Sequence, residues 1–412
     1  MRTVISAVAM VVGVTLAACS AGAQEELARV LTRMAPVVGE CREHQRQSGE
    51  SIDRIARLYG VSASAVHNAN EGDLAAGDER LLIPAAHIAP LPAAEGIVVN
   101  LPERNLYFYR GGRPIRWYPV SIGMRGWETP TGDFTIANRR KNPTWFPPKW
   151  AVEEKPVPPG PKNPLGDRWM GLSEPGYGIH ATNSPATVGR YVSHGCLRMY
   201  PEHVHELYEL APVRTPVKII YERVVVGYRS EDAIVYLAYY PDPYHVGEVT
   251  PAAVRELLKD YGLGDVVDMT AVAQVLSDTS GVPTPVVGSP VKVKVNGRLV
   301  QFVLAPIPVG SDWLVPAGPL AVAMGAQIEL GPGVNYVVAS RGDQRVFLSP
   351  GNAEALLNGE LVPLGAAPQL AAGYPLVPLR ATVTALGASL GWDEETQTLQ
   401  VWDWAVRTRA RL

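Results

Sequence analysis

From Gly96 onward the chain alternates short apolar runs with polar turns, and this texture constrains its fold more than any other feature. Residues 97–100 and 106–109 flank a polar turn, as the strands of a β-hairpin do. Further short runs and Pro/Gly-rich loops continue to Tyr221, and one helix is expected near residues 201–210. Residues 96–221 therefore predict a mainly-β domain whose long loops can carry a site over a rigid sheet.

The length and composition set wider bounds. At 412 residues the chain is too long for one ordinary core, so roughly two to four domains are expected. Hydrophobic residues make up 47% and charged residues 19%, which indicates a globular protein. The formal net charge is only −3, so no polyanion-binding surface is indicated and nucleic acid is not an expected partner.

Residues 1–23 have the composition of an export signal. Arg2 supplies a positive charge, and residues 4–18 form an apolar run too short to span a bilayer core of about 30 Å. Two cleavage sites fit: a lipobox that ends in Cys19, which would be lipidated, and an ordinary Ala-x-Ala site before Gln24. The lipobox lies directly against the apolar run, which favours an exported lipoprotein anchored to the membrane at the cell envelope.

Residues 44–84 predict a small unit with two helices between two strands. Ser51 and Ser62 are placed to cap the helices, and a short apolar strand closes the unit. This order resembles a LysM domain, the βααβ module that binds N-acetylglucosamine chains. The resemblance implies that Gly49, Ser51 and Ile52 contact a glycan strand; the alternative is a degenerate structural copy.

Two stretches are expected to connect domains. Residues 85–95 are rich in alanine and proline and predict a linker. Residues 222–290 predict a strand pair over 222–244, a helix that starts at residue 250, and a proline-rich linker over 281–290.

Residues 291–405 contain an internal repeat. A Leu-Val-Pro segment followed by a Gly-Ala pair occurs first from Leu314 and again, 62 residues later, from Leu376. This part resembles the domain named after the N-terminal part of copper amine oxidases, which implies an α+β module. His245 is the only histidine after residue 205, so no histidine-based copper site can form in the repeat, and we interpret it as non-catalytic.

The chemistry concentrates around Cys196. A thiol is a usable nucleophile only as thiolate, and an imidazole commonly generates it; His180 and His194 both lie within sixteen residues upstream. Gly195 permits a tight backbone path, so that N–H groups around Gly195 and Cys196 can face a developing oxyanion. Arg198, two residues further on, is expected on the same side as Cys196, where it can hold a carboxylate.

The segment Ser193 to Cys196, together with the upstream His180, resembles the catalytic signature of the YkuD family of L,D-transpeptidases. Further family motifs occur in order at residues 129–134, 142–145, 163–166 and 178–180. The resemblance covers residues 96–221 and implies a YkuD-like β-sandwich with a short helix.

By this resemblance Cys196 is the nucleophile and His180 the proton donor and acceptor, while Ser193, His194 and Gly195 support the site. Arg198 and Ala181 are expected to contact substrate. The family usually has glycine where Ala181 stands, and a methyl group would be strained there if the position needs a positive φ.

Three other interpretations compete at these residues. Cys196 can be a small buried hydrophobe, or it can form a disulfide with Cys41. A zinc site is the third, with ligands drawn from the following set: His180, His194, Cys196, His203 and His205. The last two histidines lie on the expected helix near 201–210, away from its apolar face, and are expected to face solvent.

The resemblance implies a peptidoglycan enzyme without cofactor or metal. Cys196 would attack the third residue of a donor stem peptide, release D-alanine, and leave a thioester that an acceptor amine resolves to a 3→3 cross-link. Two alternatives remain: a hydrolase of the L,D-carboxypeptidase type on the same fold, and a non-catalytic wall-binding scaffold. Carbapenems are expected to acylate the same cysteine.

Overall fold

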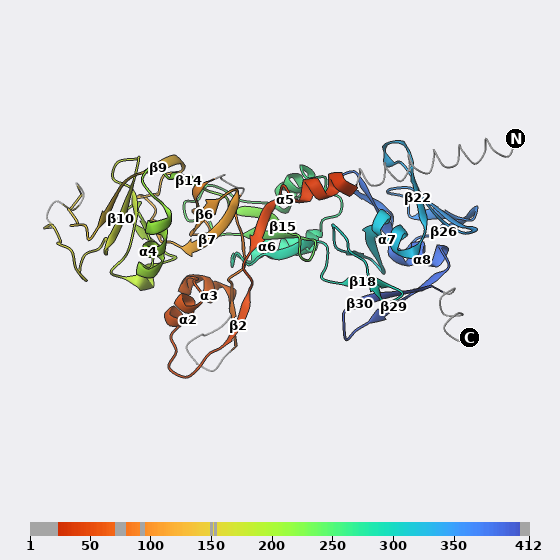
Figure 1. The fold of residues 1–412 in the computed structure, drawn as a ribbon, viewed down its shortest axis with the longest axis horizontal. Helices are drawn as coiled ribbons and strands as arrows, with labels where there is room; N and C mark the ends of the chain where they lie inside the picture. Colours follow the sequence, from red (N-terminus) through yellow and green to blue (C-terminus); the bar gives the residue numbers. More distant parts are fainter. Residues whose placement is uncertain (1–23, 71–79, 91–94, 149–150, 152–154, 404–412) are drawn as a thin grey trace.

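The computed structural model describes residues 24–70, 80–90, 95–148, 151 and 155–403. The molecule is elongated, as Figure 1 shows. Strands of residues 96–220 lie at one end and those of residues 291–403 at the other, with a further sheet between them. Residues 42–83 project to one side. The predicted signal segment with Cys19 lies outside the described residues.

Residues 42–70 and 80–83 fold as a strand, two helices and a strand, in the predicted order. The elements are β2 (Arg42–Gln45), α2 (Ile52–Leu58), α3 (Ala63–Ala69) and β3 (Arg80–Ile83), and the two strands pair antiparallel. Ser51 and Ser62 cap the helices as expected, each accepting a hydrogen bond from a backbone N–H of the first turn. Ile55 and Ile83 are buried in the small core.

An eight-stranded sheet frames the next unit, in the order β13-β11-β10-β9-β14-β5-β6-β7. Its strands are β5 (Gly96–Asn100), β6 (Asn105–Arg110), β7 (Arg113–Pro119), β9 (Gly132–Lys141), β10 (Arg168–Leu172), β11 (Gly178–His180), β13 (Leu197–Arg198) and β14 (Pro216–Ile220). Strands β5 and β6 form the predicted hairpin. A short parallel pair, β8 (Ile122–Gly123) and β12 (Tyr191–Ser193), accompanies the sheet.

One helix, α4 (Pro201–Leu210), packs against this unit where the sequence predicts it. Proline stands in its first turn, where a missing N–H costs nothing. Its apolar side chains Val204, Leu207 and Tyr208 are buried in the same core as Ile136 and Met170. The expected mainly-β architecture with a short helix is confirmed.

The middle of the molecule is built from segments far apart in the sequence. Its sheet has the order β17-β16-β15-β1-β4. The strands are β1 (Ala35–Val38), β4 (His87–Ile88), β15 (Val224–Arg229), β16 (Ile234–Tyr239) and β17 (Thr284–Val287). A helix over residues 24–31, α5 (Pro251–Lys259) and α6 (Met269–Ser277) complete it. Strand β1 lies parallel to β15, with Ala35 opposite Gly227.

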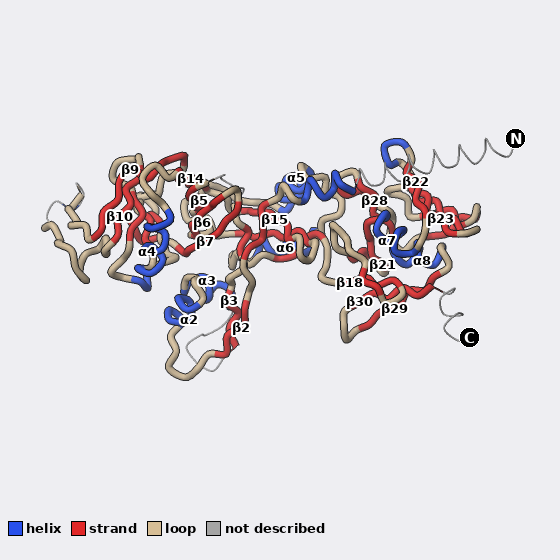
Figure 2. The backbone as a smooth tube through the Cα atoms, in the orientation of Figure 1, coloured by secondary structure: helices blue, strands red, loops and turns tan. Residues whose placement is uncertain are grey.

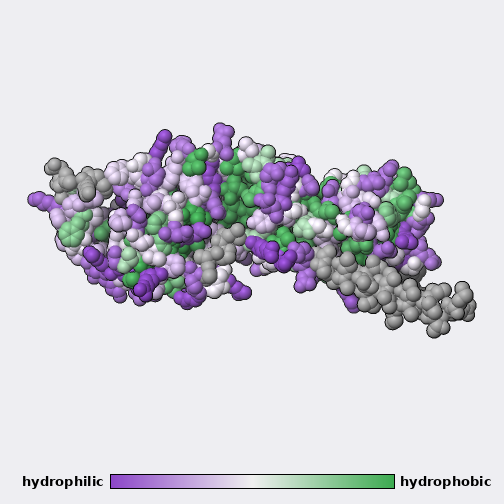
Figure 3. Space-filling model, turned by 90° about the horizontal axis from the view of Figure 1, so that it is seen from above, coloured by the Kyte–Doolittle hydropathy of each residue, from purple (hydrophilic) through white to green (hydrophobic). Residues whose placement is uncertain are grey.

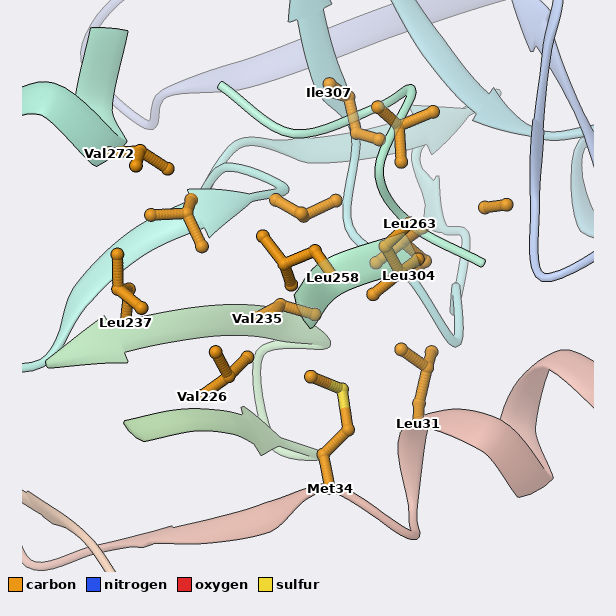
Figure 4. Close-up of a cluster of buried hydrophobic side chains, with 14 of the residues drawn as sticks. Leu31, Met34, Val226, Val235, Leu237, Leu258, Leu263, Val272, Leu304 and Ile307 are labelled. Carbon is orange, nitrogen blue, oxygen red and sulfur yellow. The ribbon is translucent and has the colours of Figure 1, made fainter. Parts of the chain in front are cut away.

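Figure 4 shows how these segments share one core. Leu31 and Met34 come from the N-terminal segment and meet Val226, Val235 and Leu258, all of them buried. Ile307, from the C-terminal part of the chain, closes the same cluster. The core therefore holds together three regions that the sequence presents separately.

The structure corrects two predicted linkers. Residues 281–290 contain β17, which pairs with β16 and buries Val286 and Val287. Residues 85–95 contain β4, which pairs with β1. Both strands are too short to be predicted from periodicity. The partner of β17 is remote in sequence, and the partner of β4 was not predicted.

The C-terminal module is α+β, as expected, and its repeat is a strand–helix–strand unit. The first copy is β21 (Asp312–Pro316), α7 (Ala317–Met324) and β22 (Gln327–Leu330); the second is β28 (Tyr374–Pro378), α8 (Leu379–Ala385) and β29 (Ala388–Asp393). The leading strands of the two copies pair with each other, Val315 opposite Val377.

The remaining strands of this module complete three sheets. They are β18 (Lys292–Val295), β19 (Arg298–Leu299), β20 (Ile307–Val309), β23 (Val337–Arg341), β24 (Gln344–Leu348), β25 (Glu354–Leu357), β26 (Glu360–Pro363), β27 (Gln369–Ala371) and β30 (Thr398–Asp403). The tube in Figure 2 shows strands and loops predominating over helix along the whole molecule.

The surface is mixed. Figure 3 shows polar side chains over most of one face and a group of hydrophobic ones near its middle. In the part of the chain that the structure describes, no helix is both long enough and apolar enough to cross a membrane.

Candidate active site

Cys196 stands in the short loop between β12 and β13, half-buried at the wall of a cleft. Its Sγ lies 3.5 Å from the Gly176 carbonyl oxygen, a distance at which a thiol donates a weak hydrogen bond. Burial raises the pKa of the Cys196 thiol, and the Gly178 N–H and the charge of Arg198 oppose that shift only in part. The resting side chain is therefore a neutral thiol.

His180 ends β11 and is only 4% exposed. Its Nδ1 lies 2.5 Å from the carbonyl oxygen of Ala181. Because a carbonyl can only accept, we assign the proton to Nδ1, which makes Nε2 the unprotonated nitrogen of the neutral ring. Burial, and then the positive charge of Arg198, lower the pKa of His180 to about 4. At neutral pH this imidazole is an uncharged base.

Trp169 holds the imidazole from the neighbouring strand. It lies opposite His180 in the β10–β11 register, and the two rings stack with centroids 5.8 Å apart. Its Nε1 donates to Asn138 Oδ1 at 3.1 Å, which fixes the plane of the indole. The ring also covers Gly178, where an added Cβ would come within 2.5 Å of it. Glycine at 178 therefore makes room for the side chain that stacks on His180.

A single cross-strand row carries these groups. Arg140 on β9 lies opposite Trp169, Trp169 opposite His180, and His180 opposite Arg198 on β13. Residues opposite one another in a sheet project from the same face. All four line the same cleft, whose volume is about 770 Å³. The row places a cation at each end and the imidazole between them.

The loop before Cys196 is fixed by hydrogen bonds. Ser193 is buried, and its Oγ accepts from the Gly195 N–H at 3.1 Å and donates to the Cys196 carbonyl at 2.6 Å. Thr129 Oγ1 donates to the Gly195 carbonyl at 3.0 Å. Gly195 has φ +101°, and an added Cβ would lie 2.5 Å from the Tyr177 ring, so only glycine fits.

One part of the expected oxyanion site is wrong. The Gly195 N–H is engaged by Ser193 Oγ inside the loop and does not face a bound substrate. Of the two expected backbone donors, only the Cys196 N–H, next to the sulfur, is left to face an oxyanion.

His194 lines the cleft beside Cys196 and is half-buried. The Trp127 ring meets it edge-on, with centroids 4.8 Å apart. Burial, and then the charge of Arg198, lower the pKa of His194. It is exposed to the cleft in a way that the buried His180 is not, and can contact a ligand directly.

The two predicted substrate contacts have different outcomes. Arg198 lines the cleft and forms no ion pair with any described residue, so its guanidinium can hold an anionic ligand there. Ala181 is fully buried, packs its methyl group on Gly166, and does not line the cleft. Its prediction as a substrate contact is corrected: Ala181 acts through the carbonyl that orients His180. Its φ is not positive, so the expected strain is absent.

The competing interpretations can be compared with the structure. Cys41 and Cys196 are both free thiols, so the disulfide is not formed. His203 does not face solvent as expected: its ring packs between Tyr118 and Tyr200 at 5.1 and 5.3 Å. His205 Nε2 instead lies 2.7 Å from Asp167 Oδ2. No group of three or more potential metal ligands occurs among the residues that the structure describes.

The three residues expected to contact glycan lie at the start of α2. Gly49 precedes the helix with φ +85°, Ser51 caps it, and Ile52 is buried in its core. Ser51 also borders a groove of about 370 Å³ that the small unit shares with Pro185, Ala186 and Tyr200 of the sheet unit. Gly49 and Ser51 are exposed, and of the three only Ser51 borders this groove.

Several residues of the site were not predicted. They are Arg140, Lys162 and Trp169 at the cleft, and Tyr244, whose Oη accepts from the Thr129 N–H at 3.1 Å and donates to the Gly123 carbonyl at 3.0 Å. Thr129 lies in a family motif that the sequence does display, but its bond to Gly195 is visible only in three dimensions. The other four lie far from the cysteine in sequence and carry no local signal.

Two family models match the chain. The model of the L,D-transpeptidase catalytic domain matches residues 94–219, and that of the copper amine oxidase N-terminal domain matches residues 294–401. A probable L,D-transpeptidase ErfK/SrfK of Salmonella typhimurium is 32% identical over 254 residues, which cover 57% of this chain and 82% of the relative. A putative L,D-transpeptidase YkuD of Bacillus licheniformis is 33% identical over 180 residues, 43% of this chain and 97% of the relative.

Among solved structures, the NMR structure of the catalytic domain from E. faecium L,D-transpeptidase covers 31% of this chain and 96% of its own. It is 24% identical to this chain, and the TM-score is 0.26.

Proposed function

This chain belongs to the YkuD family of L,D-transpeptidases, and from that premise we propose that it cross-links peptidoglycan with Cys196 as nucleophile. The observation that carries the proposal is that one cleft of about 770 Å³ is lined by both a neutral thiol and a neutral, buried imidazole. Arg198, which forms no ion pair with any described residue, stands beside them as a site for a substrate carboxylate.

The acylation step follows from these protonation states. His180 Nε2 takes the proton of Cys196 as the sulfur attacks the carbonyl carbon of the third residue of a donor stem peptide. The Cys196 N–H donates to the oxyanion that forms. When the carbon–nitrogen bond breaks, His180 returns the proton to the amine of the departing D-alanine, and a thioester remains.

In the second step His180 again accepts and then donates a proton. The side-chain amine of a neighbouring stem peptide attacks the thioester, His180 accepts a proton from that amine, and the sulfur leaves and recovers a proton from the imidazolium. The product is a 3→3 cross-link. No cofactor is consumed, because the thioester conserves the energy of the peptide bond that was broken.

Incubation with tetrapeptide-containing muropeptides tests the proposal. Mass spectrometry should detect dimers that have lost one D-alanine, and Cys196→Ala should form none. Tripeptides without dimers would instead identify a hydrolase, in which water resolves the thioester. No reaction from folded protein with a free Cys196 thiol would refute both.

We propose that residues 42–83 bind the glycan strand near Ser51. The unit is held against the catalytic unit: Arg57 donates to both carboxylate oxygens of Glu202 at 2.9 to 3.1 Å, and Ser64 Oγ donates to the Gly189 carbonyl at 2.9 Å. A bound strand would thereby present its stems beside the cleft. Oligomers of N-acetylglucosamine should displace the Cys196→Ala protein from insoluble peptidoglycan, and glucose oligomers should not.

We propose export and lipidation at Cys19, on the strength of the lipobox directly after the apolar run. Mature protein should begin at Cys19 and partition with membranes, and Cys19→Ser should release it. A mature N-terminus at Gln24 would contradict the anchor.

A further inference from the structure

Two cations of the cleft have no counterion in the part of the chain that the structure describes. Arg140 and Lys162 both line it, yet neither forms an ion pair or a side-chain hydrogen bond with any described residue. Among the described residues, those that line this cleft include three cationic side chains, counting Arg198, and no carboxylate. An unopposed set of charges in a cleft attracts an anionic ligand.

The neighbours of Arg140 show that this arrangement is particular to it. Side chains on a strand alternate between faces, so Arg139 and Lys141 project away from the cleft. Arg139 stacks over the Tyr208 ring and donates to the Tyr208 carbonyl, and Lys141 Nζ lies 3.7 Å from Glu209 Oε1. Both flanking cations therefore have partners on α4, whereas Arg140, turned to the opposite face, has none.

The cross-strand row separates the two arginines. Arg140 and Arg198 are three strand spacings apart, about 14 Å between backbones. Arg198 lies next to the reacting sulfur and serves the carboxylate nearest the scissile bond. Arg140 is too far away to share that carboxylate unless both long side chains turn inward. A ligand that uses both ends of the row carries two negative groups.

We propose that Arg140 and Lys162 form a second carboxylate subsite, which selects acyl-donor stem peptides that keep a free carboxylate several bonds away from the scissile carbonyl. The inference rests on the proposed function. A stem peptide offers such groups on its glutamate and on the side chain of its diamino acid, and conversion of either to an amide removes the charge while keeping the shape. Charge-assisted hydrogen bonds to arginine are the stronger kind, so the amide should bind less well.

The test compares matched donor tetrapeptides: one with both carboxylates free, and one amidated at either position. The readout is the rate of thioester formation on Cys196, followed by intact mass. We expect one of the two amidations to lower kcat/KM about tenfold. In Arg140→Gln and Lys162→Gln, kcat/KM for the donor with free carboxylates should fall by a similar factor. The ratio of kcat/KM between free and amidated donors should then approach one.

Lys141→Gln is the matched control, because it removes a cation from the same strand on the opposite face. It should keep the wild-type preference. Equal rates for free and amidated donors in the wild type would overturn the subsite, as would an unchanged preference in Arg140→Gln.

Failure of the proposed function is distinguishable. Acylation of Cys196 by a carbapenem reports a competent thiol and base without needing either carboxylate subsite to be identified. If the carbapenem reacts and no stem peptide does, the transpeptidase proposal fails. If stem peptides react without regard to amidation, only the second subsite fails.

Discussion

At the reacting atoms, the hydrogen bond from His180 Nδ1 to the Ala181 carbonyl decides how the thiol is activated. It fixes the tautomer that presents Nε2 as a base, and burial keeps that base uncharged. Because burial also raises the pKa of Cys196, a resting thiolate–imidazolium pair is disfavoured on both sides. We infer general-base attack, in which the proton moves as the sulfur–carbon bond forms.

The pH dependence of acylation should reveal this arrangement. His180 loses its function only when it is protonated, so the rate should fall below a pH of about 4 rather than near 6.5. At higher pH the rate should show a second increase, as the pH approaches the raised pKa of Cys196 and thiolate accumulates. Single-turnover acylation by mass spectrometry measures both limbs. A single limb near pH 6.5 would show that His180 is not desolvated as described.

Covalent trapping should locate the nucleophile. The family resemblance implies that a carbapenem forms one adduct per chain, on the peptide that contains Cys196. The adduct should be absent in Cys196→Ser, and in His180→Ala it should form on the order of a hundredfold more slowly, because the base is lost. Labelling of Cys41, also a free thiol, is the internal control. An adduct there instead would remove Cys196 from its role.

At the scale of single elements, the sequence predicted what is local. Ser51 and Ser62 predicted the starts of two helices, because capping is a short-range interaction. Three apolar residues at helical spacing predicted the buried face of α4. Cys196, His180 and His194 stood out for the same reason. Arg140 and Trp169 did not, because their place beside His180 depends on the register of β9, β10 and β11.

A loop outside the catalytic strands should affect the rate. Tyr244 bonds to Thr129 and Gly123, and Thr129 in turn bonds to the Gly195 carbonyl. Tyr244→Phe removes the hydroxyl and should lower the acylation rate roughly fivefold, since one such hydrogen bond contributes about 1 kcal/mol. Tyr228→Phe, which loses a bond to the Val303 carbonyl elsewhere, is the control. Equal rates in both variants would separate Tyr244 from the site.

At the scale of the whole molecule, the central sheet was the part that the sequence concealed. No structure was predicted for residues 24–38, yet they supply β1 and the buried Leu27, Leu31 and Met34. The pairing of β1 with β15 is parallel and long-range, and short-range patterns carry no information about such partners. The domain boundaries drawn from composition therefore missed a unit built from both ends of the described chain.

Leu31→Ala should destabilise residues 224–239, although they are remote in sequence. The side chain is fully buried against that sheet, and such truncations cost about 2–5 kcal/mol. Hydrogen exchange should show faster exchange in β15 and β16 and little change in β9 and β10. Leu58→Ala, at a side chain that is 71% exposed on α2, should leave all four strands unchanged. Unaltered protection of β15 in Leu31→Ala would refute the shared core.

The parallel pairing of Ala35 with Gly227 also sets an order of events during synthesis. Strand β4, the nearer partner of β1, follows it by about 50 residues, but β15 follows about 190 residues later, so a long loop must close before residues 24–38 are buried in the central core. The sheet of residues 96–220 is contiguous and can be complete by then. The newly made chain can thus carry the complete sheet of residues 96–220 while Leu27 and Leu31 still lack the core that buries them, and a chaperone that binds exposed leucines would find them there.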